Sequence, residues 1–268
     1  MIIRKSKREI QLMRNAGMVV AETIYALCKN AKPGITTREL GEIGADVIAS
    51  YGGKSAFLHY QTPYTPTPYP GVVCISVNDE IVHGIPGDRK LKDGDIVSVD
   101  VGVLLEGYHG DAAGTVGVGK IPEKTRKLLE VTRQCLYNGI EKASPGNRIA
   151  QIGKAVQQTA EKNGFGVVRE LVGHGVGRDL HEDPQVPNYF INGFSPLLKT
   201  GMTIAIEPMI TMGHWQVKEL SDGWTISTLD GSLSAHFEHS VAITENGPQI
   251  LTLRENGKEG FDITSKSY

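Results

Sequence analysis

Residues 99–114 of this 268-residue chain read VDVGVLLEGYHGDAAG. We interpret it as a β-hairpin that turns near Glu106-Gly107. With that turn, Gly102 faces Asp111, and Asp100 becomes the diagonal neighbour of Asp111 on the same face of the hairpin. Two carboxylates placed in this way repel each other strongly unless a cation lies between them.

An internal repeat organises the rest of the chain. IYALCKNAKPG (24–34) resembles LYNGIEKASPG (136–146), and each segment runs into a helical pattern. In the first half, Thr36 with Glu39 predicts a capping box at the start of the helix. In the second half, Asn147 is expected to cap the equivalent helix.

The repeat continues in a pair of predicted strands, LKDGDIVSVDV and LKTGMTIAIEP. Gly94 precedes Asp100 by the same distance that Gly201 precedes Glu207. Each carboxylate follows an apolar run that is typical of a buried strand, where an unpaired charge would be costly. The alternative is that both are ordinary acidic residues on a solvated strand face.

The second half supplies two further candidate ligands. Glu238 in AHFEHSVAI is the expected counterpart of Asp111, and His174 in ELVGHGVGRDLHEDP adds an imidazole. The alternative for His174 is an ordinary polar histidine. Carboxylates with one imidazole suit a pair of first-row divalent metals, and Mn, Fe, Co and Zn all remain open. Two such ions about 3.5–4 Å apart serve hydrolytic displacements, and aminopeptidases are among the enzymes that use them.

Composition excludes several classes of function. The net charge of −2 gives no electrostatic footprint for nucleic acid or for an anionic membrane. Three widely spaced cysteines indicate neither a disulfide framework nor a cysteine zinc site, and the N-terminal residues lack an apolar signal core. We therefore expect a cytoplasmic protein with one catalytic domain over 1–268, built from halves of about 1–120 and 121–268.

Several longer motifs carry a resemblance to a known family. They are NDEIVHGIP (78–86), DVGVLLEGYHGDAAGT (100–115), GHGVGRDLHEDP (173–184), GMTIAIEPM (201–209) and DGWTISTLDGSLSAHFEHS (222–240). With these motifs the chain resembles the type I methionine aminopeptidases from Arg14 to Thr244.

The resemblance implies a fold and an activity. The fold is the α+β pita-bread fold, in which pseudo-twofold halves form a central antiparallel sheet covered by helices, with the metal site on its concave face. The activity is hydrolysis of the N-terminal methionine from nascent proteins when the second residue is small, by a hydroxide bound to two metal ions.

The resemblance also implies roles for single residues. The five metal ligands of the family fall on Asp100, Asp111, His174, Glu207 and Glu238. Glu207 is also the expected general base. His181 is expected to hydrogen-bond the scissile carbonyl oxygen, and His83 to contact the leaving side of the substrate and the tetrahedral intermediate.

An apolar S1 pocket is expected for the methionine side chain. The family pattern assigns its wall to Tyr60, Tyr69, Cys74, Trp224, Phe57 and Leu180. Trp224 lies between polar turn residues, which favours a partly exposed position. A proline-rich insert from Gln61 to Pro68 departs from the family pattern, and we expect either a rim over the pocket or a surface loop without a role. Relatives also suggest a monovalent cation near Asn78 and Ser234.

The expected partners are the N-termini of nascent polypeptides, and a contact with the ribosome is left open. We expect no binding to nucleic acid or to a membrane, and we expect a monomer.

Prolidases, Xaa-Pro aminopeptidases and creatine-cleaving relatives share the fold but normally carry an extra N-terminal domain. Type II enzymes carry a helical insertion before the final glutamates, for which the span from His174 to Glu207 has no room. A binding module that has lost its ligands is the alternative outside enzymes, and the complete ligand set argues against it.

Overall fold

The computed structural model describes residues 1–63, 65 and 67–262. The helices are α1 (Lys7–Asn30), α2 (Thr37–Ser50), α3 (Glu123–Lys142) and α4 (Ile149–Lys162). The capping box expected before α2 is confirmed. The Glu39 amide donates to Thr36 Oγ1 at 3.1 Å, and Glu39 Oε2 accepts from the Thr36 amide at 2.8 Å.

The cap expected before α4 was wrong. Asn147 Nδ2 donates to the Lys142 carbonyl at 2.9 Å, so its side chain is directed back to α3. In the first turn of α4, Ser195 Oγ instead accepts from the Ala150 amide at 2.8 Å, and the Ile149 amide donates to the Pro196 carbonyl at 3.1 Å. The side chain that accepts a hydrogen bond from the first turn of α4 thus comes from a residue 45 positions away rather than from Asn147.

All the strands pair in antiparallel fashion. Those of the first half are β1 (Lys54–Ser55), β2 (Cys74–Val77), β3 (Glu80–Val82), β4 (Ile96–Leu105) and β5 (Tyr108–Gly117). Those of the second half are β6 (Gly166–Val167), β7 (Gly173–Gly175), β8 (Glu182–Val186), β9 (Thr203–Ile206), β10 (Met209–Thr211), β11 (Val217–Glu219), β12 (Ile226–Thr228), β13 (Ser234–His236), β14 (His239–Thr244) and β15 (Gly247–Ile250).

The repeated strands begin later than the sequence pattern suggested. Gly94 and Gly201 both have a φ of +92°, a conformation that favours glycine, and each ends a turn. Consequently β4 starts at Ile96 and β9 at Thr203. The equal backbone angles at these two glycines show that the repeat extends to local geometry.

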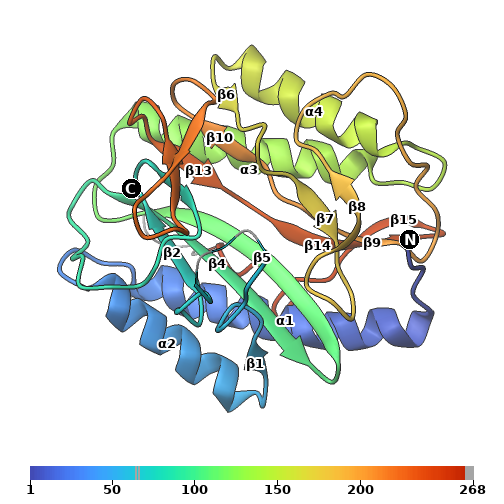
Figure 1. Cartoon of the computed structure of the whole chain (residues 1–268), viewed down its shortest axis with the longest axis horizontal. Coiled ribbons are helices and arrows are strands. Elements are labelled where there is room, and N and C mark those ends of the chain that lie inside the picture. Colours follow the sequence, from blue (N-terminus) through green and yellow to red (C-terminus); the bar gives the residue numbers. More distant parts are fainter. Residues whose placement is uncertain (64, 66, 263–268) are drawn as a thin grey trace.

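The helices lie on two opposite sides of the strands (Figure 1). α1 and α2 run along one side, and α3 and α4 along the other. α1 packs on β4 and β5, while α3 packs on β10 and β13. The approach of α1 to β5 requires glycine, because a Cβ at Gly110 would lie 2.6 Å from the backbone nitrogen of Gly17. A hydrophobic core then runs through both halves, from Val19 of α1 to Ile243 of β14.

Candidate metal centre

The first half presents its carboxylates from the β4–β5 hairpin. Gly102 pairs with Asp111 and Asp100 with Ala113, which confirms the register predicted from the sequence. The turn is tight because Glu106 and Gly107 both adopt positive φ, at 51° and 80°. Asp100 and Asp111 therefore lie diagonally across the hairpin on one face.

The second half presents its carboxylates where two strands are interrupted. Met209 pairs with His236 before the interruption, and Ile206 pairs with His239 after it. This register places Glu207 opposite Glu238. The two halves are therefore not identical at the site, since Asp111 is diagonal to Asp100 rather than opposite it.

The two half-sheets meet between β5 and the β13–β14 strand. The Glu238 amide donates to the Ala113 carbonyl at 2.9 Å. Elsewhere hydroxyls bridge the strands: Thr115 Oγ1 donates to the His236 carbonyl at 2.9 Å, and Ser240 Oγ donates to the Asp111 carbonyl at 2.8 Å. This seam brings Asp111 and Glu238 together from different halves.

His174, at the centre of β7, faces the carboxylates. Its Nε2 lies 3.7 Å from Asp111 Oδ2 and 3.5 Å from Glu207 Oε1. One ligand atom from each of Asp111, His174 and Glu238 lies within 4.8 Å of the others. His174 Nδ1 lies 2.8 Å from the Gly175 carbonyl, to which it can only donate, so Nε2 keeps its lone pair toward the carboxylates.

The electrostatics of this cluster favour either protonation of its carboxylates or a bound cation. Burial raises the pKa of Asp100 to about 7, and burial followed by repulsion from neighbouring carboxylates raises the pKa of Asp111 and Glu238 well above the usual range. Burial and then Asp100 do the same to Glu207. Among the described residues, Asp100 Oδ1, Asp111 Oδ1 and Glu238 Oε1 are buried without a hydrogen-bond partner. Such oxygens fit divalent metal ions, which would replace the missing partners.

A buried histidine at this centre was missed by the sequence analysis. His236 Nε2 lies 3.8 Å from Glu207 Oε2 and 4.0 Å from Glu238 Oε2. Burial lowers the pKa of His236 to about 3, so the ring is neutral near pH 7. A signal was present, because strand alternation places residues 236 and 238 on the same face.

The other two candidate histidines border this cluster. The exposed His181 ring packs 4.3 Å from the His174 ring, and its Nδ1 lies 2.6 Å from the Tyr60 hydroxyl. His83 has a φ of 61°, and its ring lies 6.2 Å from the Trp224 ring. Burial is the main cause that lowers the pKa of His83 to about 4, so its imidazole is neutral near pH 7.

Most of the predicted pocket residues form one apolar cluster. Its members are Phe57, Tyr60, Tyr69, Cys74, Ile85 and Trp224. Ile85 was not predicted. Leu180 is buried but lies outside this cluster.

The expected exposure of Trp224 was wrong, because only 7% of the residue is exposed. Its indole Nε1 donates to the carbonyl of Thr67, at 3.0 Å, and Thr67 belongs to the proline-rich insert. The base of the insert is closed by the Tyr69 amide, which donates to the Tyr60 carbonyl at 2.8 Å. Within the insert, residues 64 and 66 lie outside the described residues. The insert thus contacts the wall of the predicted pocket.

The two residues suggested for a monovalent cation are neighbours. The Ser234 amide donates to the Asn78 carbonyl at 2.9 Å, and Asn78 has a φ of 65°. The cation itself stays a prediction.

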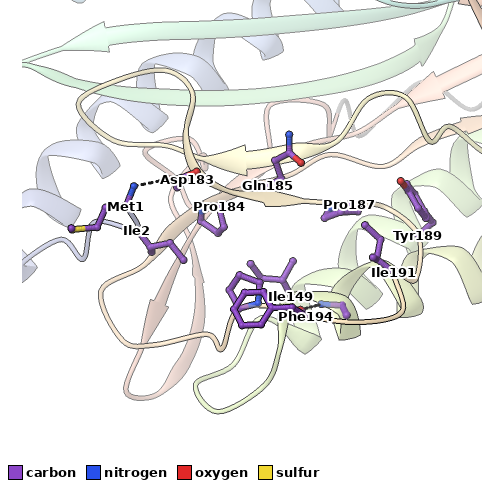
Figure 2. Close-up of a pocket in the computed structure, with 13 residues that line it drawn as sticks. Met1, Ile2, Ile149, Asp183, Pro184, Gln185, Pro187, Tyr189, Ile191 and Phe194 are labelled. Atoms are coloured by element: carbon purple, nitrogen blue, oxygen red, sulfur yellow. Dashed lines mark hydrogen bonds and ion pairs between the residues drawn. The ribbon is translucent and has the colours of Figure 1, made fainter.

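A separate cavity of about 500 Å³ lies beside the N-terminal residues and β8 (Figure 2). Its lining includes Ile2, Ile149, Pro184 and the 91% exposed Phe194. Of the described residues that line it, none belongs to the predicted site. It is therefore distinct from the apolar cluster around Trp224.

Comparison with known proteins identifies the family and several relatives of this chain. The model of metallopeptidase family M24 matches residues 11–245. The methionine aminopeptidase of Clostridium perfringens is 51% identical over 94% of this chain and 99% of its own length. Methionine aminopeptidase 1 of Bacillus subtilis is 52% identical over 94% of this chain and 99% of its own length.

Solved structures extend the comparison to the fold. The structure of methionine aminopeptidase from Thermotoga maritima has a TM-score of 0.90 and 45% identity, covering 95% of this chain and 100% of that one. A prolidase from Pyrococcus furiosus shares the fold at a TM-score of 0.72 and 24% identity, over 94% of this chain and 66% of its own. The expected pita-bread fold is confirmed. In the part of the chain that the structure describes, we find no helix with the length and hydropathy needed to span a membrane.

Proposed function

This chain belongs to metallopeptidase family M24, and from that premise we propose that it is a type I methionine aminopeptidase. It hydrolyses the bond after an N-terminal methionine, preferring substrates whose second residue is small. Relatives about half identical over nearly the full length support this activity. The observation that carries it is the buried group of Asp111, His174 and Glu238, with carboxylate oxygens that lack partners.

Two divalent ions fit this donor set. Asp100, Asp111, His174, Glu207 and Glu238 would hold them, and mixed oxygen and nitrogen donors suit Co, Mn, Fe or Zn. When bound, such a pair makes water acidic enough to act as a nucleophile near pH 7 and polarises the scissile carbonyl.

The residues of this chain move the protons and orient the substrate. Glu207 takes a proton from the attacking water and delivers it to the departing amine. The exposed His181 ring donates a hydrogen bond to the scissile carbonyl oxygen, a contact that strengthens as negative charge develops there. His83 is neutral near pH 7, so it offers one N–H to the leaving side without bringing a positive charge.

The apolar cluster selects the first residue. Trp224 meets Tyr69 edge to face at 5.2 Å, and Cys74 lies beside them in the cluster. A methionine thioether packs well against aromatic edges and tolerates an irregular cavity. Burial of these walls disfavours a charged first side chain, since its charge would be unpaired.

The setting of the reaction follows from this substrate. We propose that the enzyme acts as a monomer in the cytoplasm on the N-termini of nascent polypeptides. A net charge of −2 gives no reason to expect nucleic acid or an anionic membrane as a partner.

The role of the carboxylate–histidine cluster is tested by Glu207→Ala and His174→Ala. Both variants are expected to fold and to lose turnover of a Met-Ala-Ser peptide. Asp88→Asn is the matched control, because Asp88 is an exposed carboxylate paired with Arg38. Retention of near-native turnover by either site variant with two metals bound would show that the roles are wrongly assigned.

A further inference from the structure

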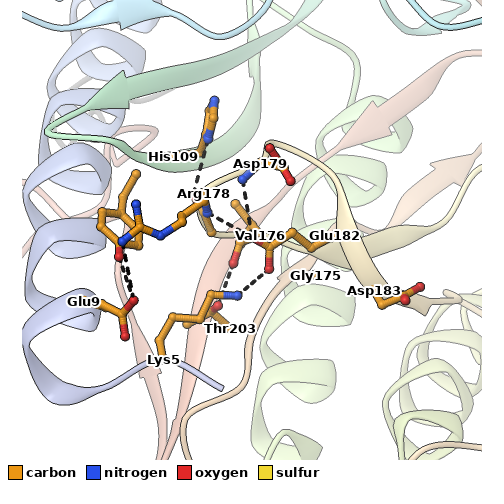
Figure 3. A network of polar contacts seen from close by, with 12 residues as sticks. Lys5, Glu9, His109, Gly175, Val176, Arg178, Asp179, Glu182, Asp183 and Thr203 are labelled. Carbon is orange, nitrogen blue, oxygen red and sulfur yellow. Dashed lines mark hydrogen bonds and ion pairs between the residues drawn. The ribbon is translucent and has the colours of Figure 1, made fainter. Parts of the chain in front are cut away.

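The segment that carries His181 is held by residues from the start of the chain (Figure 3). Lys5 Nζ donates to Glu182 Oε2, and the two form an ion pair. Their side chains are only 3% and 6% exposed. A buried pair of this kind needs complete hydrogen bonding, because neither charge is solvated by water.

Glu182 uses its second oxygen to close the turn before it. Glu182 Oε1 accepts from the Arg178 amide at 2.9 Å and from the Asp179 amide at 3.3 Å. The carboxylate that follows His181 therefore binds the backbone two and three residues before His181. This ring of contacts fixes the segment from which the imidazole projects.

Lys5 is itself held on both sides. Its amide donates to the Gly201 carbonyl at 2.6 Å, at the turn that leads into β9. On the other side, a Cβ added at Gly177 would lie 2.4 Å from Lys5 Cε, so the ammonium stem fills the space beside the segment. Lys5 thus links the strand that leads to Glu207 with the segment that carries His181.

Other contacts hold the opposite end of the segment. The His109 amide donates to the Gly177 carbonyl at 2.8 Å, and the Arg178 guanidinium stacks 4.7 Å above the Tyr108 ring. These contacts lie at Gly177 and Arg178, where the turn that Glu182 closes begins. The Lys5–Glu182 ion pair lies at the other end of the segment, next to His181.

We propose that Lys5 is a positioning residue for His181 and acts through the carboxylate of Glu182. The proposal rests on the role given to His181 in the proposed function. Without the ammonium, Glu182 is a buried carboxylate that has lost its ion-pair partner, and it turns toward solvent. This movement weakens its hold on the amides of the turn. His181 then loses the backbone support that aims its exposed ring.

The first test compares Lys5→Met with native enzyme on a Met-Ala-Ser peptide. Misplacement of the imidazole is expected to lower kcat about 10- to 100-fold. KM is expected to stay within about two-fold, because the contact strengthens in the transition state. Arg38→Met is the matched control, since it breaks an exposed pair with Asp88 and is expected to leave both constants unchanged.

Two further variants separate positioning from folding. Lys5→Arg keeps the charge and is expected to regain most of the lost kcat. The double variant Lys5→Met/Glu182→Gln removes both charges, and its amide oxygen still accepts from the Arg178 and Asp179 amides. It is expected to turn over faster than Lys5→Met alone. If Lys5→Met fails to fold, the kcat values of Lys5→Arg and of the double variant test the proposal.

Hydrogen exchange of the metal-free proteins gives a measurement independent of activity. Lys5→Met is expected to speed exchange in residues 177–183 and nowhere else, while Arg38→Met leaves the segment protected. Faster exchange confined to this segment, together with no methionine release by native enzyme, would support the Lys5–Glu182 contact as the support of the segment. The same result would contradict the proposed function. Unchanged exchange, or a folded Lys5→Met variant with native kcat, would overturn the proposal.

Discussion

Replacing Glu238 by glutamine is expected to stabilise the metal-free protein. Ligand atoms of Glu238, Asp111 and His174 lie within 4.8 Å of one another. Two unit negative charges at this separation repel by about 3.5 kcal/mol at an effective dielectric constant of about 20. The raised pKa values of Asp111 and Glu238 mean that protonation already relieves part of this repulsion. We therefore expect the amide to gain about 1–2 kcal/mol in the free energy of unfolding.

Thermal unfolding of metal-free protein at pH 7 measures this gain. For a chain of this size, the expected shift of the midpoint is about +2 to +8 °C. Asp88→Asn is the control, because that exposed carboxylate is paired with Arg38 and should shift the midpoint little. Saturating metal should reverse the order, since a ligand at 100 times its Kd stabilises native protein by about 2.7 kcal/mol and the variant binds more weakly.

A lower midpoint for metal-free Glu238→Gln, with the midpoint of Asp88→Asn unchanged, would contradict this expectation. Such a result would mean that the fold stabilises the Glu238 charge without any metal. The buried oxygen atoms of the cluster would then have partners of another kind.

Three further predictions follow from particular contacts. His181→Ala should lower kcat about 10²-fold and change KM less. Steady-state kinetics on Met-Ala-Ser measure both constants. An effect on KM alone would assign His181 to ground-state binding. Trp224→Phe removes the hydrogen bond to the Thr67 carbonyl. The loss of about 1 kcal/mol should raise KM about five-fold at constant kcat. An unchanged KM would mean that the insert does not influence the pocket. Hydrogen bonds from the Tyr108 hydroxyl and then Ser6 lower the pKa of Glu9 to about 2. Because the folded pKa is depressed, Glu9→Gln should cost about 1 kcal/mol above pH 5, after allowance for solvent screening. The cost should shrink as the pH falls toward 2, where Glu9 takes up its proton in the folded protein, and unfolding midpoints across this range test the sign.

Local features of the sequence predicted the hairpin and its glycines. A two-residue turn at Glu106-Gly107 fixes the register of both strands, so the position of Asp111 opposite Gly102 followed from the chain itself. Strand alternation would also have revealed His236, which lies two residues before Glu238.

Contacts between distant segments were not predictable in this way. Thr115 and His236 are 121 positions apart, and Lys5 and Glu182 are 177 apart. A sequence pattern shows which face of a strand is buried, but not which distant side chain lies opposite. Trp224 was misjudged for the same reason, because its neighbours in sequence are polar while the carbonyl that covers it comes from Thr67.

The most direct test of the central claim is methionine release by metal-free enzyme after separate addition of Co, Mn, Fe and Zn. Met-Ala-Ser and Leu-Ala-Ser peptides are compared at equal concentration. The cluster of Asp111, His174 and Glu238 beside an apolar wall predicts release that requires metal and favours methionine. Equal cleavage of both peptides would retain the metal centre and reject the pocket, whereas no release with any metal would contradict the account.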